Sequence, residues 1–117
     1  MSHFSTLRSK LTDAEILKAS LRDLGMTVKT NADVRGLCNQ ATPADIVAVL
    51  DGDCDLGWSR NADGSFAIVA DVWGVAKNHN LERLMSAINQ KYAVNNTLAS
   101  VKRPGLQNAN VKLLVQN

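Results

Sequence analysis

The sequence contains no apolar run long enough to cross a bilayer, and it is poor in proline, which interrupts helices and strands. Its N-terminus, MSHFSTLRSK, lacks the apolar core that a signal peptide carries. With only two prolines and 45% apolar residues, the composition argues against disorder. A chain of 117 residues is long enough for one domain with a core and too short for two ordinary ones. These features predict a single soluble domain over residues 1–117.

Motifs that hold metals, phosphates or cofactors are also missing. The two cysteines, Cys38 and Cys54, form no C-x-x-C pair and are expected to be free thiols; with His3 and His79 they match no known zinc spacing. The seven glycines form no phosphate-binding motif. The D-x-D-x-D run that begins at Asp51 lacks the later glycine and acidic ligand of a calcium loop. We therefore expect no cofactor and no metal, and the roles of the two cysteines stay open.

The strongest structural pattern lies between residues 44 and 74. Two turns, at residues 51–53 and 62–64, separate three runs with the character of β-strands. A three-residue loop at 62–64, with its glycine in the left-handed conformation, pairs Trp58 with Ile68. This register collects the apolar side chains on one face, because side chains alternate along a strand. The pattern predicts a three-strand meander with Trp58 in the core.

One helix is predicted before this meander in the chain and one after it. Thr12 and Glu15 fit a capping box for the first helix, and Gly25 fits its C-terminal end. Asn80 is expected to cap the second helix, and the poor helix formers at 95–96 predict a kink or a break in it. Both segments carry an apolar stripe at helical spacing, which indicates that each packs on a core.

The remaining segments complete the order β-α-β-β-β-β-α-β. Strands are expected within residues 2–9, 26–30 and 111–115, and residues 31–43 are expected to form a loop or an irregular edge. Helices on one face of a mainly antiparallel sheet make this an α+β fold.

One group of side chains is a candidate binding surface: Asp55, Ser59 and Asp71 on the polar face of the meander, and Trp73 at its end. Two facing carboxylates can act in acid–base chemistry when one pKa is raised. No third group is placed to orient them, so we expect both to be exposed on a solvated face. We expect Trp73 to plug the end of the sheet, and a binding patch is the alternative. No catalytic residue is identified.

Charge is distributed unevenly along the chain. Residues 41–74 carry one arginine against six aspartates, a net charge of −5, whereas residues 75–117 carry six cations against one glutamate, a net charge of +5. Opposed segments of this kind can steer a partner or bring two copies together. The cations are widely spaced, and of the aromatic residues only Trp73 and Tyr92 are candidates for base stacking, which disfavours nucleic acid.

Several segments are shared with a known family: MSHFSTLRSKLTDAEILKASLRDLG, ADVRG, ADIVAVL, DLGWSRNADGSF, ADVWGVAKNH, INQKYAV and VKLLVQ. On these segments, over almost its whole length, the chain resembles the conserved chloroplast open reading frame thirty-five family of cyanobacteria and algal plastids. Cys54 and the segment 37–43 depart from the family pattern. The resemblance implies an origin in a cyanobacterium, a plastid or a related virus, and a place in the cytoplasm or the plastid stroma. It brings no established activity, cofactor or catalytic residue.

We expect a small protein-binding accessory or regulatory factor of cyanobacteria, plastids or their viruses. The reason is the absence of a coherent catalytic set beside a rigid sheet with opposed acidic and basic segments. The expected partner is another protein, self-association is a further expectation, and no membrane partner is expected. A nucleic-acid-binding protein is one alternative, and a small-ligand-binding protein or an enzyme of unidentified activity is another. The sequence disfavours an enzyme.

Overall fold

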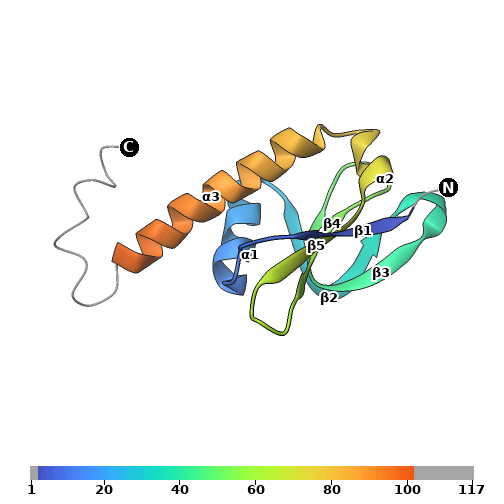
Figure 1. The fold of residues 1–117 in the computed structure, drawn as a ribbon. Helices are drawn as coiled ribbons and strands as arrows, with labels where there is room; N and C mark the ends of the chain where they lie inside the picture. The colour runs from blue at the N-terminus through green and yellow to red at the C-terminus, as the bar shows by residue number, and fades with distance from the viewer. Residues whose placement is uncertain (1–2, 102–117) are drawn as a thin grey trace.

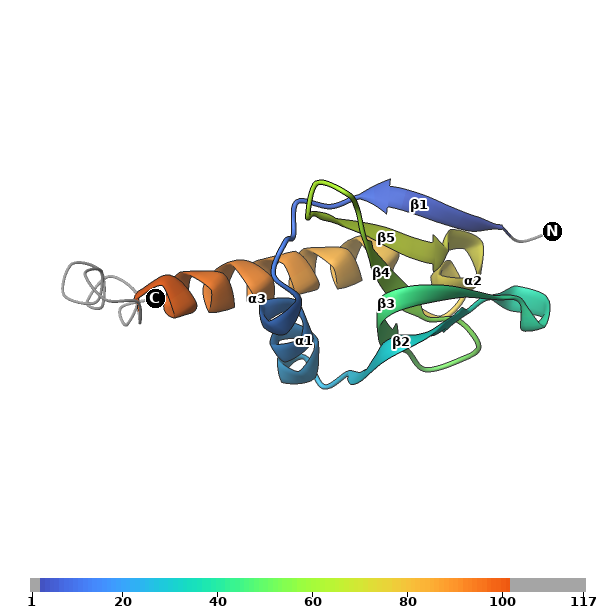
Figure 2. The same cartoon turned by 90° about the horizontal axis from the view of Figure 1, so that it is seen from below.

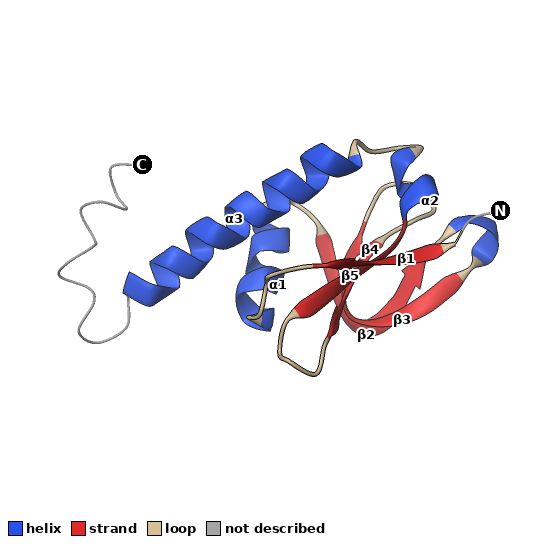
Figure 3. Ribbon diagram, viewed as in Figure 1, coloured by secondary structure: helices blue, strands red, loops and turns tan. Residues whose placement is uncertain are grey.

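The computed structural model of this chain describes residues 3–101, which form five strands and the helices that cover them (Figure 1, Figure 3). Among these residues, no helix combines the length and the apolar character needed to span a membrane. The predicted final strand at 111–115 lies outside the described residues. The elements in chain order are β1 (Phe4–Arg8), α1 (Ala14–Asp23), β2 (Thr27–Arg35), the short turn η1 (Leu37–Asn39), β3 (Ala41–Val49), β4 (Leu56–Arg60), β5 (Phe66–Asp71), α2 (Val72–Ala76) and α3 (Leu81–Val101).

The strands form one antiparallel sheet in the order β1-β5-β4-β3-β2. The predicted meander is confirmed in register, because Trp58 lies opposite Ile68 and Leu56 lies opposite Ala70. The turn between β4 and β5 holds Gly64 at a φ of +91°, the left-handed conformation that the register requires. The α+β fold class predicted from the sequence is therefore confirmed.

The main core lies between one face of the sheet and the helices α1 and α3, which pack beside each other. Trp58 is fully buried there, as predicted, and Phe66 is almost completely buried beside it. From the helices, Leu17, Leu21 and Ile88 are fully buried against the same face. Burial of these large side chains stabilises each of them by about 1.5–3 kcal/mol relative to exposure.

The β2–β3 hairpin is longer than the sequence predicted, so the expectation of a loop at residues 31–43 is wrong. Both strands continue through this segment in one register, broken only near Asn31, which has a φ of +48°. The far half of the hairpin bends over the second face of the sheet, where Val34, Ala44 and Val47 form a small core of their own. Long-range burial supplies the stability that the polar sequence of this segment does not reveal.

The N-cap of the first helix lies one residue later in the chain than predicted. Asp13, not Thr12, is the N-cap, and its Oδ1 accepts a hydrogen bond of 3.0 Å from the backbone N–H of Ile16. An aspartate caps as well as a threonine and adds a favourable charge at the helix N-terminus. The helix also carries an ion pair, with 2.6 Å between Lys18 Nζ and Glu15 Oε2.

The second predicted helix, α3, is continuous over 21 residues, so the expected kink at residues 95–96 is wrong. Asn80 caps it as predicted, since its side-chain oxygen accepts from the N–H of Arg83 at 3.0 Å. Asn95 is held inside the helix because its amide donates to Ser20 and Asp23 of α1, each at 3.0 Å. These two tertiary hydrogen bonds offset the low helix propensity of asparagine.

Candidate functional site

The candidate site lies at the end of the sheet farthest from α1. Figure 2 shows the tip of the β2–β3 hairpin, the start of β1 and α2 gathered at this end, with the start of β4 close by. Two buried carboxylates, Asp55 at the start of β4 and Asp71 at the end of β5, connect these elements. Both residues were singled out in the sequence, and the structure shows what each holds.

Asp55 binds the side chain of Arg35 through both of its oxygens. Arg35 Nη2 donates to Asp55 Oδ1 at 2.8 Å, and Arg35 Nε donates to Oδ2 at 2.9 Å. Burial by itself raises the pKa of Asp55, but the hydrogen bonds from Arg35 and from the backbone outweigh it, and the pKa lies below its usual value. The side-chain hydrogen bonds between the two residues also raise the pKa of Arg35. Asp55 is therefore a buried, ionised anchor.

The carboxylate of Asp55 also fixes the backbone around it. It accepts from the N–H of Arg35 at 3.0 Å and from the N–H of Leu50 at 3.2 Å. In return, the N–H of Asp55 donates to the carbonyl of Arg35 at 3.0 Å. These bonds join the end of β2 to the start of β4, two strands that are not neighbours in the sheet. Asp55 thus closes the bent hairpin over the sheet.

Asp71, at the end of the neighbouring strand β5, also binds backbone N–H groups of other elements. It is the N-cap of α2, because its Oδ1 accepts from the N–H of Gly74 at 3.2 Å. Its Oδ2 accepts from the N–H of Leu37 in η1 at 3.0 Å. A side chain at Gly74 would collide with Cys54 and Leu37, so glycine permits the close approach of η1 to α2. Asp71 therefore ties the hairpin tip to α2.

The expectation that Asp55 and Asp71 are exposed is wrong, since their exposed fractions are 1% and 0%. Backbone N–H groups compensate their burial, which is why both carboxylates are tolerated in the interior. Asp55 accepts from Arg35 and Leu50, and Asp71 accepts from Leu37 and Gly74, so none of these donors is shared between the two carboxylates. Ser59 lies away from them, near the other end of β4. It is half-buried and lines a hollow together with Asp45 of β3.

Trp73 is 77% exposed, so the expectation that it plugs the end of the sheet is wrong. The strand β5 stops at Asp71, and the next five residues form α2. In this helix Gly74 and Val75 face the interior and are buried, which turns the preceding residue, Trp73, outward. The structure thus shows a large aromatic side chain on a short, firmly held helix.

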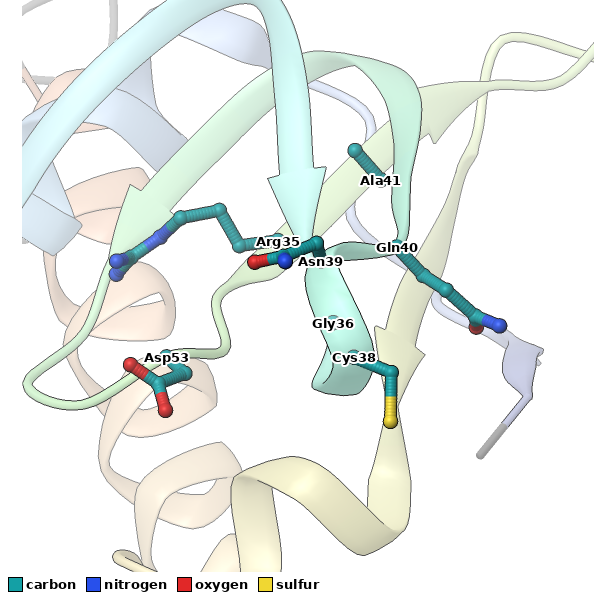
Figure 4. Close-up of a pocket in the computed structure, with 7 residues that line it drawn as sticks. All are labelled: Arg35, Gly36, Cys38, Asn39, Gln40, Ala41 and Asp53. Atoms are coloured by element: carbon teal, nitrogen blue, oxygen red, sulfur yellow. The ribbon is translucent and has the colours of Figure 1, made fainter. Parts of the chain in front are cut away.

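A hollow of about 370 Å³ lies beside η1 (Figure 4). Cys38 and Asn39 both have left-handed backbone conformations, with φ values of 59° and 60°. This pair forms the tight turn of the hairpin, closed by a 3.2 Å hydrogen bond from the N–H of Gln40 to the carbonyl of Leu37. The residues that line the hollow are Arg35, Gly36, Cys38, Asn39, Gln40, Ala41 and Asp53.

The two cysteines have different surroundings. Cys38 is exposed in the turn, whereas Cys54 is buried next to Asp55, and both are free thiols. Burial raises the pKa of the Cys54 thiol, and the nearby charge of Asp71 raises it further. Within residues 3–101, no three His, Cys, Asp or Glu side chains are grouped so that they would hold a metal ion.

Most aspartates of the acidic segment serve as local acceptors. Asp45 accepts from the N–H of Arg60 at 2.7 Å, and Asp63 accepts from the N–H of Ser65 at 2.9 Å. The hydrogen bonds from Ser65 lower the pKa of Asp63. Together with the anchors Asp55 and Asp71, four of the six aspartates counted in the sequence hold backbone groups. Only Asp55 and Asp71 are buried, so the segment still presents four exposed aspartates, at positions 45, 51, 53 and 63.

Comparisons with known proteins place these observations in a family. A family model described as "Protein of unknown function (DUF1257)" matches residues 20–114. The chain is 33% identical over 112 residues to a protein of Guillardia theta called "Uncharacterized protein ycf35". The matched region covers 94% of this chain and 86% of that relative. A protein of the same name from Pyropia yezoensis is 27% identical over 125 residues, covering 99% of this chain and 97% of the relative. No solved structure shows a significant match.

Proposed function

We propose that this chain, which belongs to the DUF1257 family of proteins of unknown function, binds another protein through the surface around Trp73. We call this the Trp73 surface and define it by Val72 and Trp73 of α2 and Leu37 and Cys38 of η1. The observation that carries the proposal is the 77% exposure of Trp73. The proposed role is that of an accessory or regulatory factor, acting in the cytoplasm or the plastid stroma.

The exposed tryptophan has the size and the placement of an interface anchor. An aromatic side chain buries about 150–250 Å² on contact, which at about 25 cal/mol per Å² is worth about 4–6 kcal/mol before the costs of association. Tryptophan is enriched among the few residues that dominate binding energy. An exposed side chain of this kind can therefore supply a large share of the binding energy of an interface.

The scaffold under the Trp73 surface is held in place before any partner arrives. Asp71 caps α2 and binds η1, and Asp55 fixes the end of β2 that leads into η1. Holding the binding groups in one conformation lowers the entropy that association costs. The two carboxylates are occupied in this task, which argues for a structural role and against catalysis by either.

Charge at this end of the molecule favours a protein partner over a nucleic acid. Asp51 and Asp53 are exposed in the β3–β4 loop, and Asp53 also lines the hollow beside η1. His79, just after α2, holds this loop through a 2.9 Å hydrogen bond between its Nε2 and the carbonyl of Asp51. The two carboxylates outnumber the exposed Lys77 that follows α2, so they would repel a phosphate backbone, on which nucleic-acid affinity largely depends.

Capture from a cyanobacterial lysate tests the proposal. The full chain and its Trp73→Ala variant serve as baits at low and at moderate salt, with nuclease added to half of each sample. Leu7→Ala is the matched control, because Leu7 is an exposed apolar residue (43%) on β1. We expect a protein that the wild type and Leu7→Ala retain, and that Trp73→Ala retains at least tenfold less, as a loss of 1.4 kcal/mol or more implies.

Three results contradict the proposal. One is a wild-type bait that retains no protein at either salt concentration. Another is a set of captured proteins that is the same for Trp73→Ala as for the wild type. Capture that nuclease abolishes would assign the surface to nucleic acid instead. Circular dichroism spectra of the three baits must coincide, which separates loss of binding from loss of fold.

A further inference from the structure

The strand β1 has an open side along one edge of the sheet. It pairs with β5 alone and stands first in the order β1-β5-β4-β3-β2, so no strand of the described residues lies on its outer side (Figure 2). Every second residue of such a strand points its backbone N–H and C=O groups away from the sheet. The structure that matches this row of hydrogen-bonding groups is another strand.

The main core is also open beside β1. Leu7 lies opposite Ile68, and Ile68 lies opposite Trp58, so all three side chains point to the core face of the sheet. Trp58 and Ile68 are buried there, whereas Leu7 is 43% exposed. A hollow of about 360 Å³ separates this end of β1 from α3 and is lined by Arg8, Ser9, Lys10, Leu11, Ile68 and Asn89. Within the described residues, the apolar face therefore continues to the edge of the sheet without a cover.

The opposite edge of the sheet, formed by β2, is different. The left-handed conformation of Asn31 interrupts its pairing with β3, and the exposed charges of Lys29 and Asp33 flank this interruption. Interruptions and charges of this kind protect a sheet edge from further pairing. On the core face, Val28 of β2 already packs against the main core. Of the two edges, β1 is therefore the one that a further strand can extend.

The same chain contains a segment that matches this edge. Residues 111–115, VKLLV, alternate in the sequence and are predicted to form a strand; they lie outside the described residues. In a strand, Val111, Leu113 and Val115 share one face, which is apolar like the uncovered core face beside β1. The family match runs to residue 114, past the end of α3, so nearly all of this segment belongs to the region that the family shares.

We propose that residues 111–115 pair with the outer edge of β1 as a sixth, antiparallel strand of the five-stranded sheet. This pairing gives the outward N–H and C=O groups of β1 their hydrogen-bond partners. It also covers Leu7 on the core face. This contact within the chain is separate from the protein binding proposed for the Trp73 surface.

The end of α3 lies within reach of this edge. Arg8 and Asn89 line the same hollow, and the helix from Asn89 to Val101 is about 18 Å long. The ten chain steps from Val101 to the segment span up to about 33 Å, which leaves about 15 Å for crossing the hollow. Since β1 and α3 run in roughly the same direction (Figure 1, Figure 2), a segment that turns back after α3 meets β1 antiparallel. Pro104 and Gly105 are residue types that favour such a turn.

Packing on both faces of the sheet selects one register. With Val111 opposite Leu7, two apolar side chains meet on the core face. The same register sets Leu114 opposite Phe4 on the second face, where Phe4 packs against the small core of the hairpin. Both faces of the new strand then contact apolar side chains of β1.

Charge selects the same register. It places Lys112 opposite Thr6, which is uncharged and exposed. Moving the strand by two residues toward the end of β1 sets Lys112 directly against Arg8, and like charges in that position destabilise a sheet. A shift by one residue turns Lys112 onto the core face, because the side chains of a strand alternate. The register with Val111 opposite Leu7 avoids both costs.

Amide hydrogen exchange of the full chain, followed residue by residue by NMR, tests this proposal. A strand with one neighbour protects alternate N–H groups, whereas a strand between two neighbours protects consecutive ones. We expect consecutive protection from Ser5 to Arg8 in the wild type. Val111→Asp sets a charge against Leu7 and should make the outward N–H groups exchange at least tenfold faster. Asn108→Asp is the matched control, because it changes the net charge equally outside the predicted strand, and it should exchange as the wild type does.

Cross-linking tests the register. In a Cys38→Ser background, the double variant Leu7→Cys, Val111→Cys should form a disulfide within one chain in a glutathione redox buffer. The reason is that opposed residues of paired strands have Cβ atoms about 4.5–5.5 Å apart, close to the distance that a disulfide requires. Leu7→Cys with Val115→Cys should not form one, since four residues of strand separate the two positions by about 13 Å.

Three results overturn the proposal. Alternate protection along β1 in the wild type would show that the edge is open. Consecutive protection that Val111→Asp leaves unchanged would place a different strand on this edge. A disulfide of the Leu7→Cys, Val111→Cys variant that links two chains, and none within one chain, would assign the edge to a second copy. Because these measurements use the purified chain alone, they are independent of the capture that tests the Trp73 surface.

Discussion

Replacing Asp55 by asparagine removes the charge that holds the bent hairpin over the sheet. Asparagine keeps the shape of the side chain, but it presents an NH₂ group where one carboxylate oxygen accepted hydrogen bonds. In either orientation the buried NH₂ would face a donor of the Arg35 guanidinium, together with the backbone N–H of Leu50 or of Arg35. The change therefore leaves donors opposed to donors in a site that is 1% exposed.

The expected cost follows from the number and type of bonds that are lost. Hydrogen bonds to a charged group contribute about 1.5–3 kcal/mol, and an unsatisfied buried group costs about 1–3 kcal/mol. We expect Asp55→Asn to lower the free energy of unfolding by about 2–3 kcal/mol. The side chain of Arg35 is 45% exposed, whereas that of Asp55 is 2% exposed. Arg35→Met strands the buried carboxylate, so it should cost more, about 3–5 kcal/mol.

A double-mutant cycle measures the coupling between these two residues. Urea unfolding of the wild type, the two single variants and the double variant can be followed by tryptophan fluorescence, since Trp58 is buried and reports loss of the core. The double variant should be about 1.5–3 kcal/mol more stable than the sum of the single effects predicts, because it has no buried charge without a partner. An Asp55→Asn variant within about 0.5 kcal/mol of the wild type would refute this reasoning.

The same pair predicts the dependence of stability on pH. The pKa of Asp55 is lower in the folded protein than its ordinary value of about 3.9, so the folded state binds this proton more weakly than the unfolded state does. The stabilisation is therefore present above about pH 4 and is lost as the pH falls through the folded pKa. Asp55→Asn should flatten this acid limb of the stability curve, and an unchanged limb would assign it to other carboxylates.

Two further substitutions test the packing of the same end of the molecule by urea unfolding. Cys38→Gly should raise the free energy of unfolding by about 1 kcal/mol, because Cys38 has a φ of 59°, which disfavours residues with a Cβ; a destabilised variant would indicate that the thiol makes contacts of its own. Gly57→Ala should lower it by about 1–3 kcal/mol through overpacking, since a Cβ there collides with Val34 and lies 3.0 Å from that of Ala44; a variant as stable as the wild type would show that the hairpin can lift from the sheet.

The sequence predicted the meander because its determinants are local. A glycine at position 64 in a short loop, with alternating apolar residues on both sides, specifies the register of β4 and β5 without any distant contact. Asn80 and the apolar stripe of α3 were predicted for the same reason. For these elements the deciding interaction spans only a few residues, and the sequence was sufficient.

The burial of Asp55 and Asp71 depends on partners far away in the chain. Arg35 lies 20 residues from Asp55, and Leu37 lies 34 residues from Asp71. In the sequence Asp55 differs little from Asp53, its exposed neighbour in the same D-x-D-x-D run. Arg35 follows an alternating segment, which was a usable sign of a longer β2, but nothing local indicates which carboxylate it meets. Pairing across the fold could not be predicted from spacing.

The short helix α2 was missed because its composition is that of a strand. Val72, Trp73 and Val75 all have high β propensity, and they continue the alternation of β5. The available sign was Asp71 as a possible N-cap, but the helix has only five residues, too few for an apolar stripe to show. This one error reversed the predicted position of Trp73, from the interior to the surface.

Because aspartates of the acidic segment accept hydrogen bonds inside the fold, charge contributes less to binding a partner than the sequence suggests. A net charge of −5 over residues 41–74 suggests electrostatic steering, but Asp55 and Asp71 are buried, and Asp55 is paired with Arg35. A buried carboxylate that is already paired contributes less to attracting a partner than an exposed one does. Binding at the Trp73 surface, whose centre is an exposed tryptophan, should therefore depend mainly on apolar contact. It follows that moderate salt, which screens exposed charges, should leave this binding largely in place.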